Sequence, residues 1–318
     1  MAGLTANGPG TRVPGARVPG RRRRLRLLTR TDRVVLGLMV AVPTAIELVL
    51  IWLPSVASVG LSFTRWDGIS LDDIRAAGLR NYRYTVQDYA PFWPAVQHNL
   101  FWLAALSVIA TPLGLLFAVL LDQRIRGSRL YQSVFFLPVM LSLALIGIIW
   151  RLIYNQNTGL LNSVLGTASR PNAVDWLGDS GINLWAAIVA ASWKHCGYIM
   201  ILYLAGLKGI DPELKEAAHL DGASGWQAFW RVVFPTMRPI NIVVVVITVI
   251  EALRAFDIVW VLNKGTNGLE LLSALVIRNL IGEGQDIGVG SAIAVALMAV
   301  SLVPIVIYLT RVFRRSDQ

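Results

Sequence analysis

The chain has 318 residues, of which 55% are hydrophobic and only 15% are charged, and its mean hydropathy is +0.58. A soluble globular domain usually has about 25% charged residues, so this composition excludes an ordinary soluble protein. The formal net charge is +10, and nine arginines precede Val34. A basic tail beside an apolar segment is typical of a protein that contacts anionic membrane lipid, and we expect no nucleic-acid partner.

The first 33 residues are rich in glycine, proline and arginine. Such a segment has too few apolar side chains to offset the entropy cost of folding, so we expect a disordered, basic, cytoplasmic tail at residues 1–33. The apolar run that follows is too long for a signal peptide and shows no clear cleavage site, and we expect it to be retained.

Six apolar segments follow the tail. A membrane-spanning helix needs about 20 apolar residues, whereas a strand of a membrane barrel needs only about 10. The long runs therefore predict an all-α, polytopic membrane protein with six transmembrane helices within residues 34–310, followed by a short cytoplasmic tail at 311–318. The expected spans cover residues 34–63, 100–121, 131–153, 184–207, 240–262 and 287–309.

Lysine and arginine predict the orientation of these spans, because positively charged loops stay in the cytoplasm. Both chain ends, the connection between the second and third spans, and the connection at 208–239 carry an excess of basic residues. The segment 64–99 balances four arginines with four aspartates, and 155–183 has one arginine against two aspartates. We therefore expect both termini to be cytoplasmic, in a multi-pass protein.

Residues that commonly bind metals or act as nucleophiles are scarce. Cys196 is the single cysteine, so no intrachain disulfide can form, and the three histidines lack the grouping of a zinc site. No Ser/His/Asp or Cys/His arrangement predicts nucleophilic catalysis. We expect no metal site and no catalytic residues, and an enzyme that acts within the membrane is the weaker alternative.

The connection at 208–239 reads as two short helices. Asp211 suits the N-cap of the first helix, Pro212 suits its first position, and Gly222 can end it in a left-handed conformation. Ser224 and Gln227 have the spacing of a capping box for a second helix. Four apolar residues then follow at helical spacing, namely Trp226, Phe229, Trp230 and Val233. These residues alone are also compatible with an amphipathic helix that rests on lipid.

The same connection contains a longer ordered pattern: Glu216-Ala217-Ala218, then Asp221-Gly222-Ala223, then Phe234-Pro235. It resembles the signature loop of permease subunits in binding-protein-dependent ABC importers, although Phe234 stands where leucine is usual. The resemblance implies that 208–239 is a coupling loop between the fourth and fifth spans, with a coupling helix that fits a cleft of an ATPase. The residues that it assigns to ATPase coupling are Glu216, Ala217, Ala218, Asp221, Gly222, Ala223 and Pro235.

Further patterns resemble carbohydrate importer permeases, most closely the maltose-transporter type of membrane subunit. They are Gly78-Leu79-Arg80-Asn81-Tyr82, Gly159-Leu160-Leu161-Asn162, Leu204-Ala205-Gly206-Leu207 and Phe256-Asp257. The usual Gly-Gly-Pro after the fifth span is replaced by Lys264-Gly265-Thr266-Asn267-Gly268. The resemblance implies a bacterial inner-membrane subunit that forms the translocation pathway for a sugar or oligosaccharide.

The resemblance also implies partners. A nucleotide-binding P-loop needs a lysine directly after a glycine, and none of the four lysines follows one. We therefore expect this chain to bind no cofactor and ATP with Mg to be bound by partner subunits. The implied partners are a second permease subunit in a heterodimer, two ATPase subunits and an extracytoplasmic solute-binding protein.

Ionisable residues inside spans are costly, so they mark a pathway or a specific pair. The candidates for the substrate pathway, with two aromatic residues that could stack on a sugar ring, are Trp193, Lys194, Tyr198, Glu251, Arg254 and Asp257. The structural alternative is that Glu251, Arg254 and Asp257 neutralise one another along one helix, since they are spaced three residues apart.

Two other functions stay open. A permease for a different polar solute, such as a glycerol-phosphate compound, would need basic groups at the cavity, and Lys194 or Arg254 could supply them. An ion-driven secondary transporter would need no ATPase, but the sequence shows no convincing inverted repeat.

Overall fold

The computed structural model of the chain describes residues 29–123, 128–282 and 285–316. The chain divides into two units, one up to Leu53 and one from Pro54 onward. The first unit holds helix α1 (Arg30–Glu47) and the π-helical turn η1 (Leu48–Trp52). Thr29 and Asp32 form a capping box at the start of α1, so the helix begins four residues before the expected span. The tail expected at 1–33 lies mostly outside the described residues.

The second unit is helical except for a short two-stranded ribbon. The antiparallel strands β1 (Thr64–Arg65) and β2 (Arg75–Ala76) pair Thr64 with Ala76. The helices before the coupling loop are α2 (Leu53–Leu61), 3₁₀ turn η2 (Leu71–Asp73), α3 (Arg80–Gln87), α4 (Phe92–Ala105), π turn η3 (Leu106–Ala110), α5 (Thr111–Asp122), α6 (Ser128–Met140), α7 (Leu143–Ile153), α8 (Leu160–Val164) and α9 (Asn183–Lys208).

The rest of the unit begins with the coupling loop. Its helices are α10 (Pro212–Leu220), α11 (Gly225–Ala228), π turn η4 (Phe229–Val233), α12 (Phe234–Thr236), α13 (Arg238–Leu253), α14 (Asp257–Asn263), α15 (Leu272–Ile281) and α16 (Ile287–Ser316). Helix α16 continues to Ser316 and so includes residues 311–316 of the expected cytoplasmic tail, whose side of the membrane stays a prediction.

Four described helical segments are long and apolar enough to cross a membrane: Thr31–Leu61, Phe92–Asp122, Asn183–Lys208 and Ile287–Ile307. The third expected span is not one helix, because α6 and α7 are bent by 104° at Leu141–Ser142, and it counts as a fifth crossing only if the bent pair spans together. The fifth expected span is interrupted after Leu253. Its first part, α13, has 16 residues and is about 24 Å long, shorter than the hydrocarbon core of about 30 Å. The count of six spans therefore stays a prediction.

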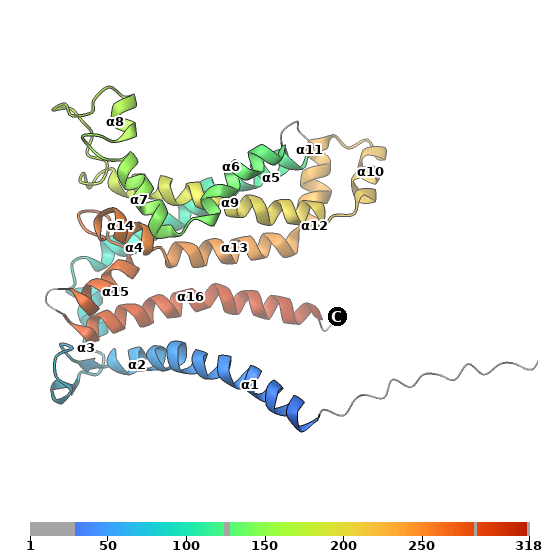
Figure 1. Ribbon diagram of the computed structural model, residues 1–318. Helices are drawn as coiled ribbons and strands as arrows, with labels where there is room; N and C mark the ends of the chain where they lie inside the picture. The colour runs from blue at the N-terminus through green and yellow to red at the C-terminus, as the bar shows by residue number, and fades with distance from the viewer. Residues whose placement is uncertain (1–28, 124–127, 283–284, 317–318) are drawn as a thin grey trace, which may run out of the picture. The chain divides into compact units, whose positions relative to one another are not determined.

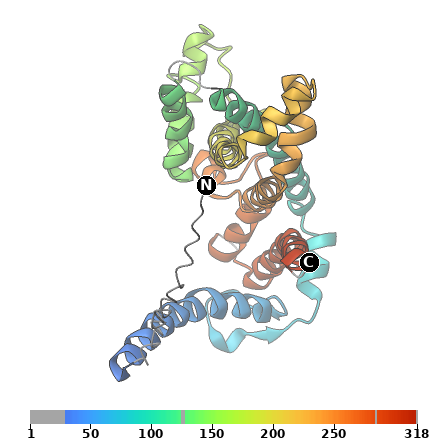
Figure 2. The same cartoon turned by 90° about the vertical axis from the view of Figure 1, so that its right-hand side faces the viewer.

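Helix α9 is the packing centre of the second unit. A Cβ added to Gly114 of α5 would lie 2.8 Å from the Cys196 carbonyl oxygen of α9, and Gly197 of α9 lies directly against the Phe135 carbonyl of α6. Small residues allow this close approach of backbones in membrane proteins. Helices α9 and α13 are also in contact, as are α13 and α16, and all three run side by side (Figures 1 and 2).

The two ends of this unit differ in content. Helices α10, α11 and α12 lie at one end, together with the C-terminal end of α16 (Figure 1). The ribbon, α3 and α8 lie at the opposite end (Figure 1). The coupling loop and the loops expected outside the cell are therefore separated by the length of the helices.

Candidate functional site

Helix α10, the expected coupling helix, has the ends that its sequence predicts. Asp211 is the N-cap, and its Oδ1 atom accepts a hydrogen bond of 3.0 Å from the backbone N–H of Glu213. At the other end, Gly222 has a φ of +79°, its N–H donates to His219, and the N–H of Ala223 donates to Ala218. This pair of hydrogen bonds is the Schellman motif. The predictions for Asp211 and Gly222 are confirmed.

The second helix also begins as predicted. The Ser224 hydroxyl accepts from the N–H of Gln227 at 3.3 Å, and the Ser224 N–H donates to the Gln227 side chain at 2.9 Å. The chain then continues through η4 and α12 with a chain of aromatic contacts, in which Trp230 touches both Trp226 and Phe234. Val233 and Met237 are buried in a core with α5 and α9. The residues expected on one apolar face therefore differ in burial, because Val233 is buried and Trp226 is largely exposed.

Most of the residues assigned to ATPase coupling are open to solvent. Glu216, Ala217, Asp221, Gly222 and Pro235 are exposed, Ala223 is half-buried, and Ala218 faces the protein. A Cβ placed on Gly222 would meet no atom within 4 Å. Leu220, at the end of the same helix, is 89% exposed. The part of the chain that the structure describes therefore does not cover this surface.

One ion pair ties α10 to the helix bundle. The Lys215 Nζ atom lies 3.2 Å from Asp122 Oδ2, at the end of α5, and both side chains are partly buried. It is the only ion pair among the residues that the structure describes. Because α5 packs closely against α9, this ion pair links α10 to the centre of the bundle.

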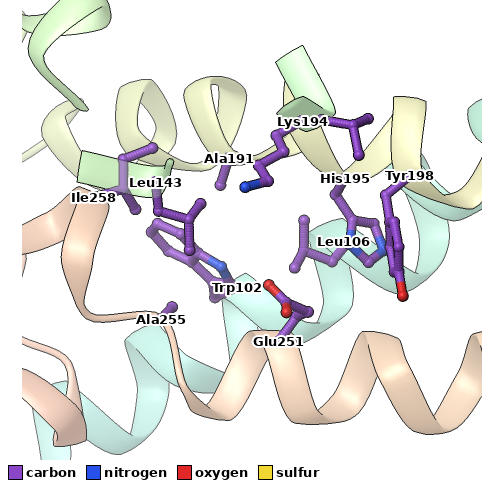
Figure 3. A pocket seen from close by; sticks show the side chains of 11 residues that line it. Trp102, Leu106, Leu143, Ala191, Lys194, His195, Tyr198, Glu251, Ala255 and Ile258 are labelled. Carbon is purple, nitrogen blue, oxygen red and sulfur yellow. The ribbon is translucent and has the colours of Figure 1, made fainter. Parts of the chain in front are cut away.

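A cavity of about 340 Å³ lies within the bundle. It is bounded by α4, η3, the α6–α7 break, α9 and α13, and its lining residues approach from opposite sides (Figure 3). The side chains that line it are Trp102, Leu106, Val139, Leu143, Ala191, Lys194, His195, Tyr198, Glu251, Ala255 and Ile258.

The predicted pathway residues fall into two groups. Lys194, Tyr198 and Glu251 line the cavity, whereas Trp193, Arg254 and Asp257 do not. Trp193 instead makes an edge-to-face contact with Trp150, with ring centroids 5.9 Å apart.

Glu251, Arg254 and Asp257 do not share one helix. Arg254 is the C-cap of α13, and Asp257 starts α14 after a break in the chain. Among the described residues these three form no ion pair, so the expected neutralisation along one helix is wrong.

Lys194 has a specific partner at the break in the third expected span. Its Nζ atom donates a hydrogen bond of 2.8 Å to the carbonyl oxygen of Leu141. Carbonyls at the end of a helix lack intrahelical partners, and Leu141 follows directly after the last residue of α6. Ser142 then caps α7 by accepting from the N–H of Leu145. Lys194 thus stabilises the bent wall of the cavity.

Sequence reasoning missed Trp102 and His195 as lining residues. Trp102 is 1% exposed and lies in an apolar run without a polar neighbour that would single it out. His195 Nε2 lies 3.2 Å from the Thr248 hydroxyl and 3.3 Å from that of Thr111, which joins α9 to α13 and α5. Its position next to Lys194 was the available signal. The described residues contain no group of three potential metal ligands.

Known proteins resemble the chain over most of its length. Residues 110–316 match the family described as binding-protein-dependent transport system inner membrane component. The osmoprotective compounds uptake permease protein GgtC of Synechocystis is 35% identical over 84% of this chain and 94% of its own. The trehalose/maltose transport system permease protein MalF of Thermococcus litoralis is 32% identical over 86% of this chain and 92% of its own.

The fold also matches a solved structure. A bacterial ABC transporter involved in the import of the acidic polysaccharide alginate superimposes with a TM-score of 0.74 at 20% identity, over 89% of this chain and 96% of that one. The family match, the identities to curated permeases and the shared helical fold agree with one another. The chain therefore belongs to the family of binding-protein-dependent transport system inner membrane components.

Proposed function

We propose that the chain is one permease subunit of an ATP-driven importer, which forms the translocation pathway for a sugar or oligosaccharide. Relatives named for xylose and arabinose, for trehalose and maltose, and for arabinooligosaccharides support a carbohydrate substrate. The subunit carries out transport, and ATP hydrolysis with Mg takes place on partner chains.

The observation that carries this proposal is the exposed coupling loop. Glu216, Ala217 and Gly222 occupy an ordered surface that no other part of the described chain covers. A helix with small, exposed residues allows a partner backbone to approach closely, and Glu216 can accept a charge-assisted hydrogen bond from an arginine. We assign this surface to an ATPase subunit.

The route of coupling follows from the contacts of α10. Closure of an ATPase pair would move α10 as a rigid body, and the Lys215–Asp122 pair would pass the motion to α5. The aromatic contacts around Trp230 would pass it through α12 to α13. Helices α9 and α13 both line the cavity, so these two routes end at the substrate pathway.

Within the cavity, we assign substrate contacts to Tyr198 and Glu251, whereas Lys194 lines the cavity and donates to the Leu141 carbonyl. Tyr198 presents an aromatic ring that can stack on the apolar face of a sugar. The positions of Trp193, Arg254 and Asp257 outside this cavity give them no supporting geometry, and their role in the pathway stays a prediction.

The remaining parts of the proposal concern assembly and topology. We propose a heterodimer with a second permease, two ATPase subunits and an extracytoplasmic solute-binding protein, in the bacterial inner membrane. We propose six crossings with both termini in the cytoplasm, and the separation of the coupling loop from the ribbon, α3 and α8 supports opposite sides of the membrane for these two sets of loops (Figure 1). A solved alginate transporter contains a periplasmic protein that holds an alginate pentasaccharide, which supports the binding-protein partner.

Reconstitution tests the function directly. The complete complex in liposomes should take up at least one of maltose, trehalose or arabinooligosaccharide when ATP is inside and loaded binding protein is outside. Uptake that continues without ATPase subunits and follows an ion gradient would support a secondary transporter instead.

Labelling tests the orientation. In a Cys196→Ala background, Ile69→Cys should react with an impermeant thiol reagent in intact cells and Lys208→Cys only in inverted vesicles. Ile69 is 84% exposed and Lys208 is exposed, so access is limited by the membrane. Reaction of Lys208→Cys from outside would overturn the topology.

A further inference from the structure

We propose that the cavity selects uncharged, hydroxyl-rich solutes and rejects acidic sugars, because Glu251 is its uncommitted charged group and Lys194 is held by the protein. This inference rests on the proposed function and specifies the substrate class of the same site. It concerns the charge of the solute, which neither the family nor the shared fold decides, since the structural neighbour imports an acidic polysaccharide.

The positive group of the cavity is already engaged. Lys194 Nζ donates to the Leu141 carbonyl at 2.8 Å, at the bend between α6 and α7. This hydrogen bond uses one of the three N–H groups and holds the ammonium beside a carbonyl that the broken helix cannot satisfy itself, so Lys194 is not free to turn toward a substrate carboxylate or phosphate without losing it. Lys194 is therefore a positioning residue that fixes the cavity wall.

The other basic candidates do not supply a positive charge to the cavity. His195 is 6% exposed, and one ring nitrogen is shared between the hydroxyls of Thr111 and Thr248. Arg254 does not line the cavity, since it caps the end of α13. Phosphate recognition needs convergent cationic donors, so this arrangement disfavours a glycerol-phosphate compound.

The acidic group is free. Glu251 lines the cavity opposite Lys194 (Figure 3), and among the described residues its carboxylate forms no hydrogen bond and no ion pair. A carboxylate accepts hydrogen bonds from sugar hydroxyls and repels a second carboxylate. Tyr198 adds aromatic surface on the same lining, which suits the apolar face of a sugar ring.

Measurements of direct sugar binding distinguish the role of Glu251 from that of Lys194. The detergent-purified complete complex, without binding protein, would be dialysed against radiolabelled maltose or trehalose and against the same sugar with one primary hydroxyl oxidised to a carboxylate. We expect the oxidised sugar to bind at least about tenfold more weakly to the wild type. Glu251→Gln should bring the two affinities close together, whereas Asp257→Asn, which removes an acid outside the cavity, should leave their ratio as it is.

Substitutions of Lys194 form the second part of the same binding experiment. Lys194→Met should weaken both sugars in the same proportion, because it loosens the wall, and Lys194→Arg should restore both, because a guanidinium can still donate to Leu141. Selective loss of the oxidised sugar in Lys194→Met would show an anion-binding lysine and overturn the inference. Equal binding of both sugars by the wild type, or an unchanged ratio in Glu251→Gln, would also overturn it. Absence of uptake for every sugar would instead contradict the proposed function.

Should a neutral sugar be taken up while neither form binds the complex measurably, the cavity would not be the selective site, and the inference fails. If Lys194→Met does not assemble, the Glu251→Gln and Lys194→Arg complexes still decide the outcome.

Discussion

The motif residues that resemble permeases differ in burial between the loops at the two ends of the helices. At the end with α3 and α8, such residues are buried and bonded within the chain. Asn81 is 4% exposed and donates to the carbonyls of Ser62 and Thr64 at 2.8 and 2.7 Å. Asn162 is fully buried and donates to the carbonyls of Gln156 and Val174. At the other end, Glu216 and Gly222 are exposed.

The buried motif residues stabilise the fold, whereas the exposed ones are available to contact a partner subunit. A buried asparagine that donates to two backbone carbonyls stabilises the fold, and this role accounts for the residue at that position. The exposed side chains of Glu216 and Ala217 have no such explanation within the described part of the chain. We infer that the motifs at the first end are structural and that the coupling loop acts through another subunit, and Asn162→Ala and Glu216→Ala test this distinction.

The largest effect is expected for Asn162→Ala. The change leaves two carbonyl oxygens without their donor, and it removes the acceptor of the Trp176 indole N–H. Each unsatisfied buried group costs about 1–3 kcal/mol, so the melting temperature and yield of the complex should fall sharply. Asn157→Ala is the matched control, because its exposed side chain makes none of these bonds. A stable Asn162→Ala complex that fails to respond to binding protein would instead place this motif in recognition.

Glu216→Ala should leave the permease as stable as before and weaken its association with the ATPase. Loss of one buried, charge-assisted hydrogen bond costs about 1.5–3 kcal/mol, which corresponds to at least tenfold weaker association. Pull-down of ATPase by the permease pair measures it. Glu213→Ala, on the same helix, should have little effect, and equal losses in both variants would argue against a specific contact at Glu216.

A smaller effect is expected for the ion pair that ties α10 to α5. Lys215→Met breaks a partly exposed ion pair worth about 1 kcal/mol, so the complex should assemble but couple ATP hydrolysis to uptake less efficiently. The ratio of sugar taken up to ATP hydrolysed is the readout, with Lys208→Met as control. Asp122→Asn should add little to Lys215→Met, and strictly additive losses would mean that the pair does not act as a unit.

The smallest effect concerns two neighbouring aromatic residues of α9. Trp193→Leu should lower stability by about 0.5–1 kcal/mol, because it removes the contact with Trp150, and leave the KM for uptake unchanged. Tyr198→Leu should raise the KM instead, because its ring lines the cavity. A raised KM in Trp193→Leu alone would restore the original stacking prediction for Trp193.

Local signals in the sequence predicted local structure well. The caps at Asp211 and Ser224 and the positive φ of Gly222 depend on residues a few positions apart, so a single sequence carries them. Hydropathy predicted where the apolar helices lie, but it does not detect a backbone break inside an apolar run. The bend at Leu141–Ser142 was therefore missed, although Pro138 and the capping residue Ser142 were readable signals.

The cavity required tertiary structure. The cost of ionisable residues in spans predicts Glu251 and Lys194, which line the cavity, but it equally predicts Arg254, which does not. The commitment of Lys194 to Leu141 joins residues 53 positions apart, and no sequence pattern predicts it.

The most direct test of the account is binding-protein-stimulated ATP hydrolysis by the reconstituted complex with Gly222→Asp beside Gly225→Asp. Both glycines have open space around an added Cβ, but only Gly222 has a positive φ, where a side chain costs roughly 1 kcal/mol or more. The new carboxylate would also adjoin Asp221 on the exposed turn. We predict that Gly222→Asp assembles and loses stimulated hydrolysis and uptake, while Gly225→Asp retains most of both. Wild-type stimulation in Gly222→Asp would contradict the assignment of this loop as the element that transmits motion.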